Sequence, residues 1–197
     1  MVLQRASYMV SVPSSSVGGE QLGHRGEQRD KRQSGGWRAP RPGRIKVNID
    51  AFVPNGRLMG FGYIAWNSRG QVLATTSSKW PRTVSVATTE AMALRWGLQL
   101  SLELGFFEVE VELDNQVVVT SWKGAKKHVS YLADVISDTV RVSQCSRFFS
   151  LDYVPRLSNL AADYLAKFAL SDYCFVGIEE HPADLASVLS ADLISMH

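Results

Sequence analysis

The sequence predicts an α/β domain built on one mixed sheet, and two observations support that prediction. Three strand-like runs with alternating apolar residues come first, at residues 46–52, 58–66 and 71–79, separated by turn signals. Two later runs, at residues 107–113 and 147–154, each follow helical stretches. Strands joined by tight turns pair antiparallel, whereas strands reached through helices run parallel to an earlier strand. The order therefore predicts five strands, the first three antiparallel and the last two parallel to the first.

Helices are expected between and after these strands. The first, at residues 86–104, has Thr88 or Thr89 as its expected N-cap and Gly105 as the residue that ends it. Further helices are expected at residues 115–122, 130–143, 157–170 and, beyond the sheet, 182–195. The helices are expected to flank the sheet and complete the α/β domain.

The chain divides into an arm, a domain and a tail. Residues 1–36 are rich in Ser, Gly, Gln and Arg and lack periodicity, which predicts a disordered, basic N-terminal arm. Residues 37–173 form the predicted domain. Residues 174–197 form an acidic tail with a short helix, since the last 23 residues hold four acids and no Lys or Arg.

Composition predicts an intracellular protein without a membrane span. The formal net charge of +2 does not by itself indicate nucleic acid. Cys145 and Cys174 are too few for a disulfide framework, so two reduced thiols are expected. No apolar run reaches membrane-spanning length, and the N-terminus lacks the apolar core of a secretory signal. An organelle transit peptide stays open as an alternative, and nucleus and cytoplasm are not distinguished.

Two acids stand at or near strand ends. Asp50 lies within the first strand, where aspartate is depleted because its carboxylate competes for backbone hydrogen bonds. Asp114 follows the fourth strand and shares the parity of Glu108, Glu110 and Glu112, which are expected to be solvated. A solvated strand face would explain both acids, and Asp114 is also a possible N-cap. A metal or acid–base site is the alternative, because α/β sheets place sites where strands feed helices.

Two further acids belong to helices. Glu90 lies in the first turn of its helix and heads an apolar stripe that continues through Leu94 and Leu98. Attraction to the helix dipole would explain why an acid lies near the N-terminus of the helix, but not why it lies on the apolar face. The position of Glu90 on that face favours a site residue. Asp163 flanks an apolar face, and on spacing alone an i,i+4 pair with Lys167 is the simpler explanation.

Convergence of these four acids would restrict the chemistry. Four clustered carboxylates do not all stay ionised without a counter-charge. Oxygen ligands suit hard divalent cations, so Mg²⁺, with Mn²⁺ as a substitute, is the expected cofactor. Two such ions would stabilise the attacking and the leaving oxygen of a phosphodiester during in-line displacement.

The order of elements with these four acids resembles the ribonuclease H type 1 family, and in detail its retrotransposon-derived branch common in plant genomes. The similarity extends from about Trp37 to Ser171. Each motif alone is weak, but together, in this order and on the predicted strands and helices, the motifs are specific. The matching phrases are Lys46-Val-Asn-Ile-Asp50, Gly60-Phe-Gly62-Tyr-Ile-Ala-Trp-Asn-Ser-Arg-Gly70, Thr89-Glu90-Ala91, Val111-Glu-Leu-Asp114-Asn-Gln116, Val154-Pro155-Arg156, and Asn159 through Asp163 to Ala166.

The resemblance implies a ribonuclease H-like fold and an endonuclease that cuts the RNA strand of RNA/DNA hybrids to leave 5′-phosphates. It implies that Asp50, Glu90, Asp114 and Asp163 are catalytic and bind two Mg²⁺ ions. It also implies nucleic-acid contacts, which distinguish RNA by its 2′-hydroxyls, from Thr89, Asn115, Gln116, Arg156 and Asn159. The expected partner is an RNA/DNA hybrid, and the protein is expected to be a monomer.

Two departures from the family pattern leave a second function open. Phe52 stands where the family has a small residue, and a bulky ring there would narrow the approach of a phosphate. Many relatives carry a mobile histidine in the loop before the last aspartate, where this chain has Arg156. The alternative is therefore a catalytically weak or inactive nucleic-acid-binding domain derived from a mobile element.

One further motif is excluded. Gly60 to Ala65 matches a dinucleotide-binding fingerprint by its letters, but it lies in a strand-like run and not at the start of a helix. The four histidines are scattered and no nucleophile elbow is present, so serine-type hydrolysis has no support.

Overall fold

A computed structural model describes residues 37–54, 58–81, 84–124 and 130–171, with short tail pieces at 176–178, 184–186 and 189. All of these residues belong to one compact unit, Ser34–His197. Cys145 is a free, exposed thiol, as expected. The expected arm at residues 1–36, Cys174 and most of the expected tail helix lie outside the described residues. No helix in the described ranges is long and apolar enough to span a membrane.

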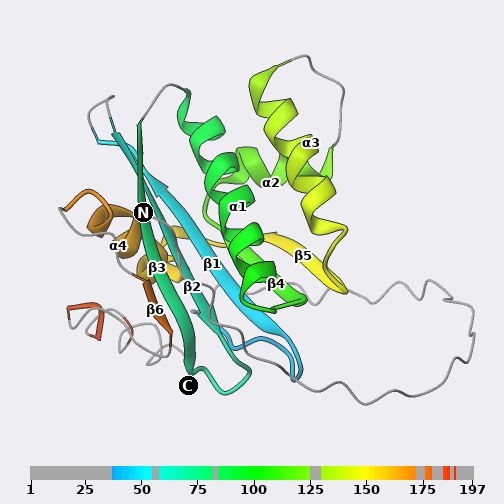
Figure 1. Cartoon of the computed structure of the whole chain (residues 1–197), viewed down its shortest axis with the longest axis vertical. Coiled ribbons are helices and arrows are strands. Elements are labelled where there is room, and N and C mark those ends of the chain that lie inside the picture. Colours follow the sequence, from blue (N-terminus) through cyan, green and yellow to red (C-terminus); the bar gives the residue numbers. More distant parts are fainter. Residues whose placement is uncertain are drawn as a thin grey trace, which may run out of the picture. The chain divides into compact units, whose positions relative to one another are not determined.

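The described chain forms one mixed sheet with the strand order β5-β4-β1-β2-β3-β6 (Figure 1). Strands β1 and β2 pair antiparallel, as do β2 and β3, while β4 pairs parallel with both β1 and β5. The predicted pairing of five strands is therefore confirmed, with β1 in the interior of the sheet. The strands are β1 (Ile45–Phe52), β2 (Leu58–Trp66), β3 (Val72–Pro81), β4 (Glu108–Leu113), β5 (Phe148–Tyr153) and β6 (Val176–Ile178).

The sixth strand is the one difference from the predicted sheet. Strand β6 is three residues long and pairs antiparallel with Ala74–Thr76 of β3. A three-residue run has no room for the alternation that identifies a strand in a sequence, so its β structure comes from the edge of β3 on which it docks. It covers part of an edge that would otherwise offer unpaired backbone groups.

Helices cover both faces of this sheet. They are α1 (Val86–Glu103), α2 (Gln116–Lys123), α3 (Tyr131–Ser143) and α4 (Leu160–Phe168), with a short 3₁₀ turn η1 (Arg156–Ser158) before the last. Helices α1, α2 and α3 share one apolar core with the sheet, whereas α4 belongs to a second core on the opposite face (Figure 1). Alternation along β2 separates the two cores, because Tyr63 faces the first and Ile64 the second.

Helix α1 begins earlier than its expected cap. Its N-cap is Ser85, whose Oγ accepts a hydrogen bond from the backbone N–H of Thr88 at 3.3 Å. The prediction of Thr88 or Thr89 was wrong, because both residues lie inside the first turn, where the Thr89 hydroxyl donates back to the Ser85 carbonyl. The end of the helix is as expected, with Gly105 at a φ of +80°.

Two glycines of β2 bring α4 onto the sheet at backbone contact. A Cβ atom on Gly60 would lie 2.0 Å from the carbonyl oxygen of Ala166, and one on Gly62 would lie 2.1 Å from that of Ala162. Gly62 is also the antiparallel partner of Asp50. Both glycines belong to the motif that was rejected as a dinucleotide fingerprint because it lies in a strand. Their role is to allow α4 to lie directly against the strands that position Asp50.

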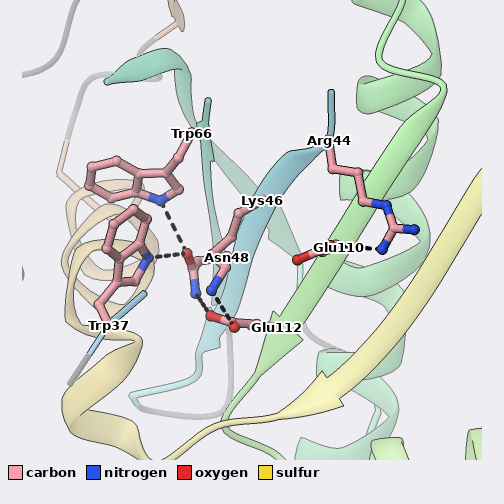
Figure 2. A network of polar contacts seen from close by, with 7 residues as sticks. All are labelled: Trp37, Arg44, Lys46, Asn48, Trp66, Glu110 and Glu112. Atoms are coloured by element: carbon pink, nitrogen blue, oxygen red, sulfur yellow. Dashed lines mark hydrogen bonds and ion pairs between the residues drawn. The ribbon is translucent and has the colours of Figure 1, made fainter. Parts of the chain in front are cut away.

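A buried polar network fixes the chain just before β1 to the sheet. Asn48 Oδ1 accepts hydrogen bonds from the indole nitrogens of Trp37 at 3.3 Å and Trp66 at 3.1 Å, and Figure 2 shows both rings converging on this atom. Asn48 Nδ2 donates to Glu112 at 3.1 Å, and Lys46 Nζ donates to the other oxygen of Glu112 at 2.6 Å. The sequence predicted a solvated face for Glu112, which is instead buried beside a lysine from the neighbouring strand.

Glu112→Leu is expected to lower the free energy of unfolding by about 3 kcal/mol, because it leaves the ammonium of Lys46 buried without its partner. The double variant Lys46→Met/Glu112→Leu is expected to recover most of that loss. Urea denaturation measures both, with Glu108→Ala on the same strand as a control. A double variant no more stable than the single one would contradict the prediction.

Candidate active site

Asp50 lies in the interior strand β1 and is almost entirely buried, with 4% of its surface exposed. Burial, and then the negative charges of Asp114 and Asp163, raises the pKa of Asp50 to about 8. A hydrogen bond to the Asp114 side chain acts in the same direction, and the positive charge of Arg156 opposes it. A solvent-exposed carboxyl group would keep an ordinary pKa and would not be buried. The burial and the raised pKa of Asp50 therefore favour a metal or acid–base site over a solvated strand face.

Glu90 reaches the same place from helix α1. It is the fifth residue of α1, just past the first turn in which the sequence placed it, because the helix begins at Val86. Its side chain is buried, as its position at the head of an apolar stripe predicted. Burial and the charges of Asp50 and Asp114 raise the pKa of Glu90 well above its ordinary value, while a hydrogen bond with the backbone of Ala51 lowers it. Its Oε2 has no hydrogen-bond partner among the described residues. An unpartnered buried carboxylate oxygen needs a ligand or a proton.

Asp114 completes a group of three carboxylates. It follows β4 and is half-buried, and Asn115 caps α2 in its place by accepting from the N–H groups of residues 117 and 118. Asp50, Glu90 and Asp114 each offer one oxygen, and these oxygens all lie within 4.8 Å of one another. This spacing, the oxygen ligands and the unpartnered Glu90 atom fit a hard divalent cation.

Asp163 is close to this group but differently engaged. It lies in the first turn of α4 and is buried. Its Oδ2 accepts from Lys167 Nζ and its Oδ1 from Arg156 Nη2, each at 2.5 Å. The i,i+4 pair considered from the sequence is therefore formed, and the Arg156 pair was not predicted. Asp163 is not part of the set within 4.8 Å, although its charge acts on Asp50.

The five residues expected to contact nucleic acid fall into two groups. Gln116 and Arg156 are exposed, and Asn115 is half-buried as the N-cap of α2. Thr89 and Asn159 are buried, and Asn159 Nδ2 donates to the backbone carbonyl of Ile49 in β1 at 2.9 Å. Asn159 therefore ties the start of α4 to the residue before Asp50. Contact of these residues with nucleic acid stays a prediction.

Phe52 shares the face of β1 that carries Asp50, because side chains two residues apart along a strand point the same way. It is half-buried, and the Nζ of Lys167 lies 5.6 Å from the centre of its ring. A cation over an aromatic face is attracted by the ring quadrupole. Phe52 thus contributes to holding the lysine that binds Asp163, a role that the sequence did not indicate.

The mixed sheet with helices on both faces is a ribonuclease H-like fold, and it carries an acidic cluster where β1, α1 and the end of β4 meet. A family model described as reverse transcriptase-like matches residues 48–169, and the chain belongs to this family. No curated protein sequence matches the chain.

Solved ribonuclease H structures share this fold. RNase H1 from the halophilic archaeon Halobacterium salinarum is 24% identical with a TM-score of 0.62, over 66% of this chain and all of that one. The N-terminal RNase H domain of a Mycobacterium tuberculosis protein is 24% identical with a TM-score of 0.57, over 64% of this chain and 93% of that one. LC11-RNase H1, solved in complex with an RNA/DNA hybrid, is 21% identical with a TM-score of 0.58, over 64% and 96% respectively.

Proposed function

We propose that this protein is a divalent-cation-dependent endonuclease that hydrolyses the RNA strand of RNA/DNA hybrids and leaves 5′-phosphate and 3′-hydroxyl ends. The observation that supports it most directly is the convergence of Asp50, Glu90 and Asp114 within 4.8 Å, where one buried Glu90 oxygen has no hydrogen-bond partner in the part of the chain that the structure describes. The fold is that of RNase H1 structures, one of which is solved with an RNA/DNA hybrid.

The three converging carboxylates would hold the first Mg²⁺ ion, and Asp163 would join Asp50 in holding a second. When bound, such ions lower the pKa of the attacking water and stabilise the charge that develops on the departing 3′ oxygen. The raised pKa of Asp50, about 8, reflects burial first and then repulsion by Asp114 and Asp163, and a bound divalent cation would favour the ionised carboxylate against both.

The chain's own residues would bind and orient the hybrid. Gln116 and Arg156 are exposed near the acids, where an amide suits a minor groove edge and a guanidinium suits a phosphate. Thr89, Asn115 and Asn159 complete the proposed set, with Asn159 acting chiefly by holding α4 against β1. Contacts with the 2′-hydroxyls would select the RNA strand for cleavage.

A second function is favoured by one feature of the site. Arg156 and Lys167 bind the two oxygens of Asp163, and Phe52, on the face of β1 that carries Asp50, lies beside Lys167. A domain that kept this arrangement when bound to nucleic acid would bind without cutting efficiently. The chain would then be a catalytically weak binding domain derived from a mobile element.

The discriminating experiment incubates purified protein with a hybrid whose RNA strand carries a 5′ label, in Mg²⁺ or Mn²⁺. Cleavage of the RNA strand is expected, with no cleavage of single-stranded RNA or duplex DNA. Asp114→Asn is expected to lose activity by at least about a hundredfold, because it removes one of the three converging ligands. Asp134→Asn, an exposed acid in α3, is the matched control and is expected to cut like wild type.

The two functions predict different results in this assay. Equal cleavage by wild type and Asp114→Asn would reveal a contaminant and contradict the nuclease proposal. Absence of cleavage by either protein, together with retention of the hybrid on a filter, would favour the binding domain. Products that a ligase joins directly would establish the 5′-phosphate and 3′-hydroxyl ends.

A further inference from the structure

The carboxylate of Asp163 is the most fully neutralised acid of the site. Its two oxygens accept from two different cations at 2.5 Å each, and 9% of its side chain is exposed. Asp50, Glu90 and Asp114, by contrast, share no such ion pair within the described residues. One acid of the expected four is therefore paired, while the other three converge without a cation of their own.

The two cations that hold Asp163 differ in their freedom to move. Lys167 belongs to the same helix, one turn along, and its ammonium lies over the ring of Phe52. Arg156 comes from the short turn η1, and 63% of its side chain is exposed. The positive charge of Arg156 also lowers the pKa of Asp50 and of Glu90. Arg156 is thus the exposed counter-charge of the whole cluster, and Lys167 the anchored partner of Asp163.

We propose that Arg156 is a transferable counter-ion, which occupies Asp163 in the free protein and moves to a phosphate of the nucleic acid when the substrate binds. The transfer frees one oxygen of Asp163 to take a divalent cation, while Lys167 keeps the other oxygen in place. Arg156 is then a substrate-contacting residue and Lys167 a positioning residue. This inference rests on the proposed nuclease function and deepens it.

Charge and geometry both support such a transfer. A guanidinium binds a phosphate through two parallel hydrogen bonds, which compensate for the bond given up at Asp163. The three converging carboxylates and the nearby Asp163 need a counter-charge, so loss of Arg156 from Asp163 raises the affinity of these acids for a cation. Nucleic acid and a second divalent ion should therefore bind with positive coupling, and the coupling is reciprocal.

Binding of Mn²⁺ to the free protein provides the first test. Titration calorimetry with metal-stripped wild-type protein is expected to show one strong Mn²⁺ site, at Asp50, Glu90 and Asp114. Arg156→Gln is expected to strengthen binding of a second Mn²⁺ by on the order of tenfold. The control is Arg141→Gln, which removes an exposed arginine paired with Asp138 in α3 and is expected to match wild type.

The second test adds a hybrid of 2′-O-methyl RNA and DNA, which presents phosphates but resists cleavage. This hybrid is expected to strengthen binding of the second Mn²⁺ in wild type by on the order of tenfold, and to have little effect in Arg156→Gln. Arg156→Lys keeps the charge without the two-pronged geometry. It should still exclude the second ion from the free protein, but show weaker coupling to the hybrid.

Two wild-type sites of equal strength, or the same Mn²⁺ affinities in wild type and Arg156→Gln, would overturn the counter-ion role. Circular dichroism confirms that each variant is folded before titration. A protein that shows the coupling but cuts no hybrid would refute the proposed nuclease function and leave the counter-ion role standing. A protein that cuts hybrids while Arg156→Gln binds Mn²⁺ like wild type would refute only the counter-ion role.

Discussion

Asp50→Asn is expected to stop cleavage of RNA/DNA hybrids and, at the same time, to make the metal-free protein more stable at alkaline pH. The loss of cleavage should be on the order of a thousandfold or more, because an amide is a poor ligand for the divalent ions that Asp50 is proposed to hold. The gain in stability arises because the substitution removes a carboxylate that is buried and lies close to other acids.

The pH dependence of that gain follows from the raised pKa. Between the ordinary pKa of 3.8 and the folded pKa of about 8, the folded chain holds a proton on Asp50 that the unfolded chain has lost. The free energy of unfolding therefore falls as pH rises through this window. Above pH 8 the folded protein bears the full free-energy cost of an ionised, buried Asp50. Asparagine carries no such cost. The variant should match wild type near pH 4 and exceed it by roughly 2–5 kcal/mol at pH 9.

Urea denaturation in the presence of EDTA, at several pH values from 4 to about 9, measures this difference. Saturating Mg²⁺ should reverse the order of stability, because only wild type gains free energy by binding the ion in its folded state. Asp134→Asn serves again as the control, since it removes an exposed acid. The same pH dependence in Asp50→Asn and wild type would contradict the assignment of the buried charge.

The sequence predicted the direction of an acidic side chain where a periodic pattern set it. Glu90 heads a helical stripe whose members Leu94 and Leu98 are fully buried, so its inward face followed from the spacing alone. The position of Asp114 near Asp50 followed from the parallel pairing of β1 and β4, because the carboxyl ends of parallel strands lie at one edge of the sheet. Local periodicity and strand order are enough to bring these groups together.

The charge partners of the site could not be predicted in the same way. Arg156 reaches Asp163 from the turn η1, which directly precedes α4, and a three-residue turn leaves no periodic signal. Glu112 was expected to be solvated, since alternating charges along a strand usually mark an exposed face. Its burial depends on the register that sets Lys46 and Asn48 beside it from another strand. Contacts between distant segments decide such cases.

Gly62→Ala is expected to destabilise the fold strongly, although it adds only one methyl group. The added Cβ would lie 2.1 Å from the carbonyl oxygen of Ala162 and 2.4 Å from the backbone nitrogen of Ala166. Backbone atoms of a helix do not move aside as a side-chain end does, so α4 has to shift as a unit or the fold has to open. The expected loss in the free energy of unfolding is about 4 kcal/mol or more.

Two other glycines separate this steric cause from the general cost of replacing glycine. A Cβ on Gly97 would meet side-chain atoms and no backbone among its nearest neighbours: Cδ1 and Cγ1 of Ile49 at 2.5 and 3.0 Å, and Cδ2 of Tyr63 at 3.3 Å. Side chains adjust more readily than helix backbone and alanine favours the helix, so the net effect of Gly97→Ala should be less than about 1.5 kcal/mol. Gly124→Ala has its nearest contact at 3.1 Å and should be nearly neutral. Urea denaturation ranks the three variants, and similar losses for Gly62→Ala and Gly97→Ala would contradict the backbone clash.

The same substitution tests how the site depends on α4. This helix carries Asp163 in its first turn, and Asn159 at its N-terminus donates to the carbonyl of Ile49, next to Asp50. Any Gly62→Ala protein that stays folded must hold α4 farther from β2, which moves Asp163 away from Asp50. We expect such protein to keep one strong Mn²⁺ site and to lose hybrid cleavage, because the three converging acids lie on β1, α1 and the end of β4. Retention of full cleavage would show that the position of α4 does not limit the reaction.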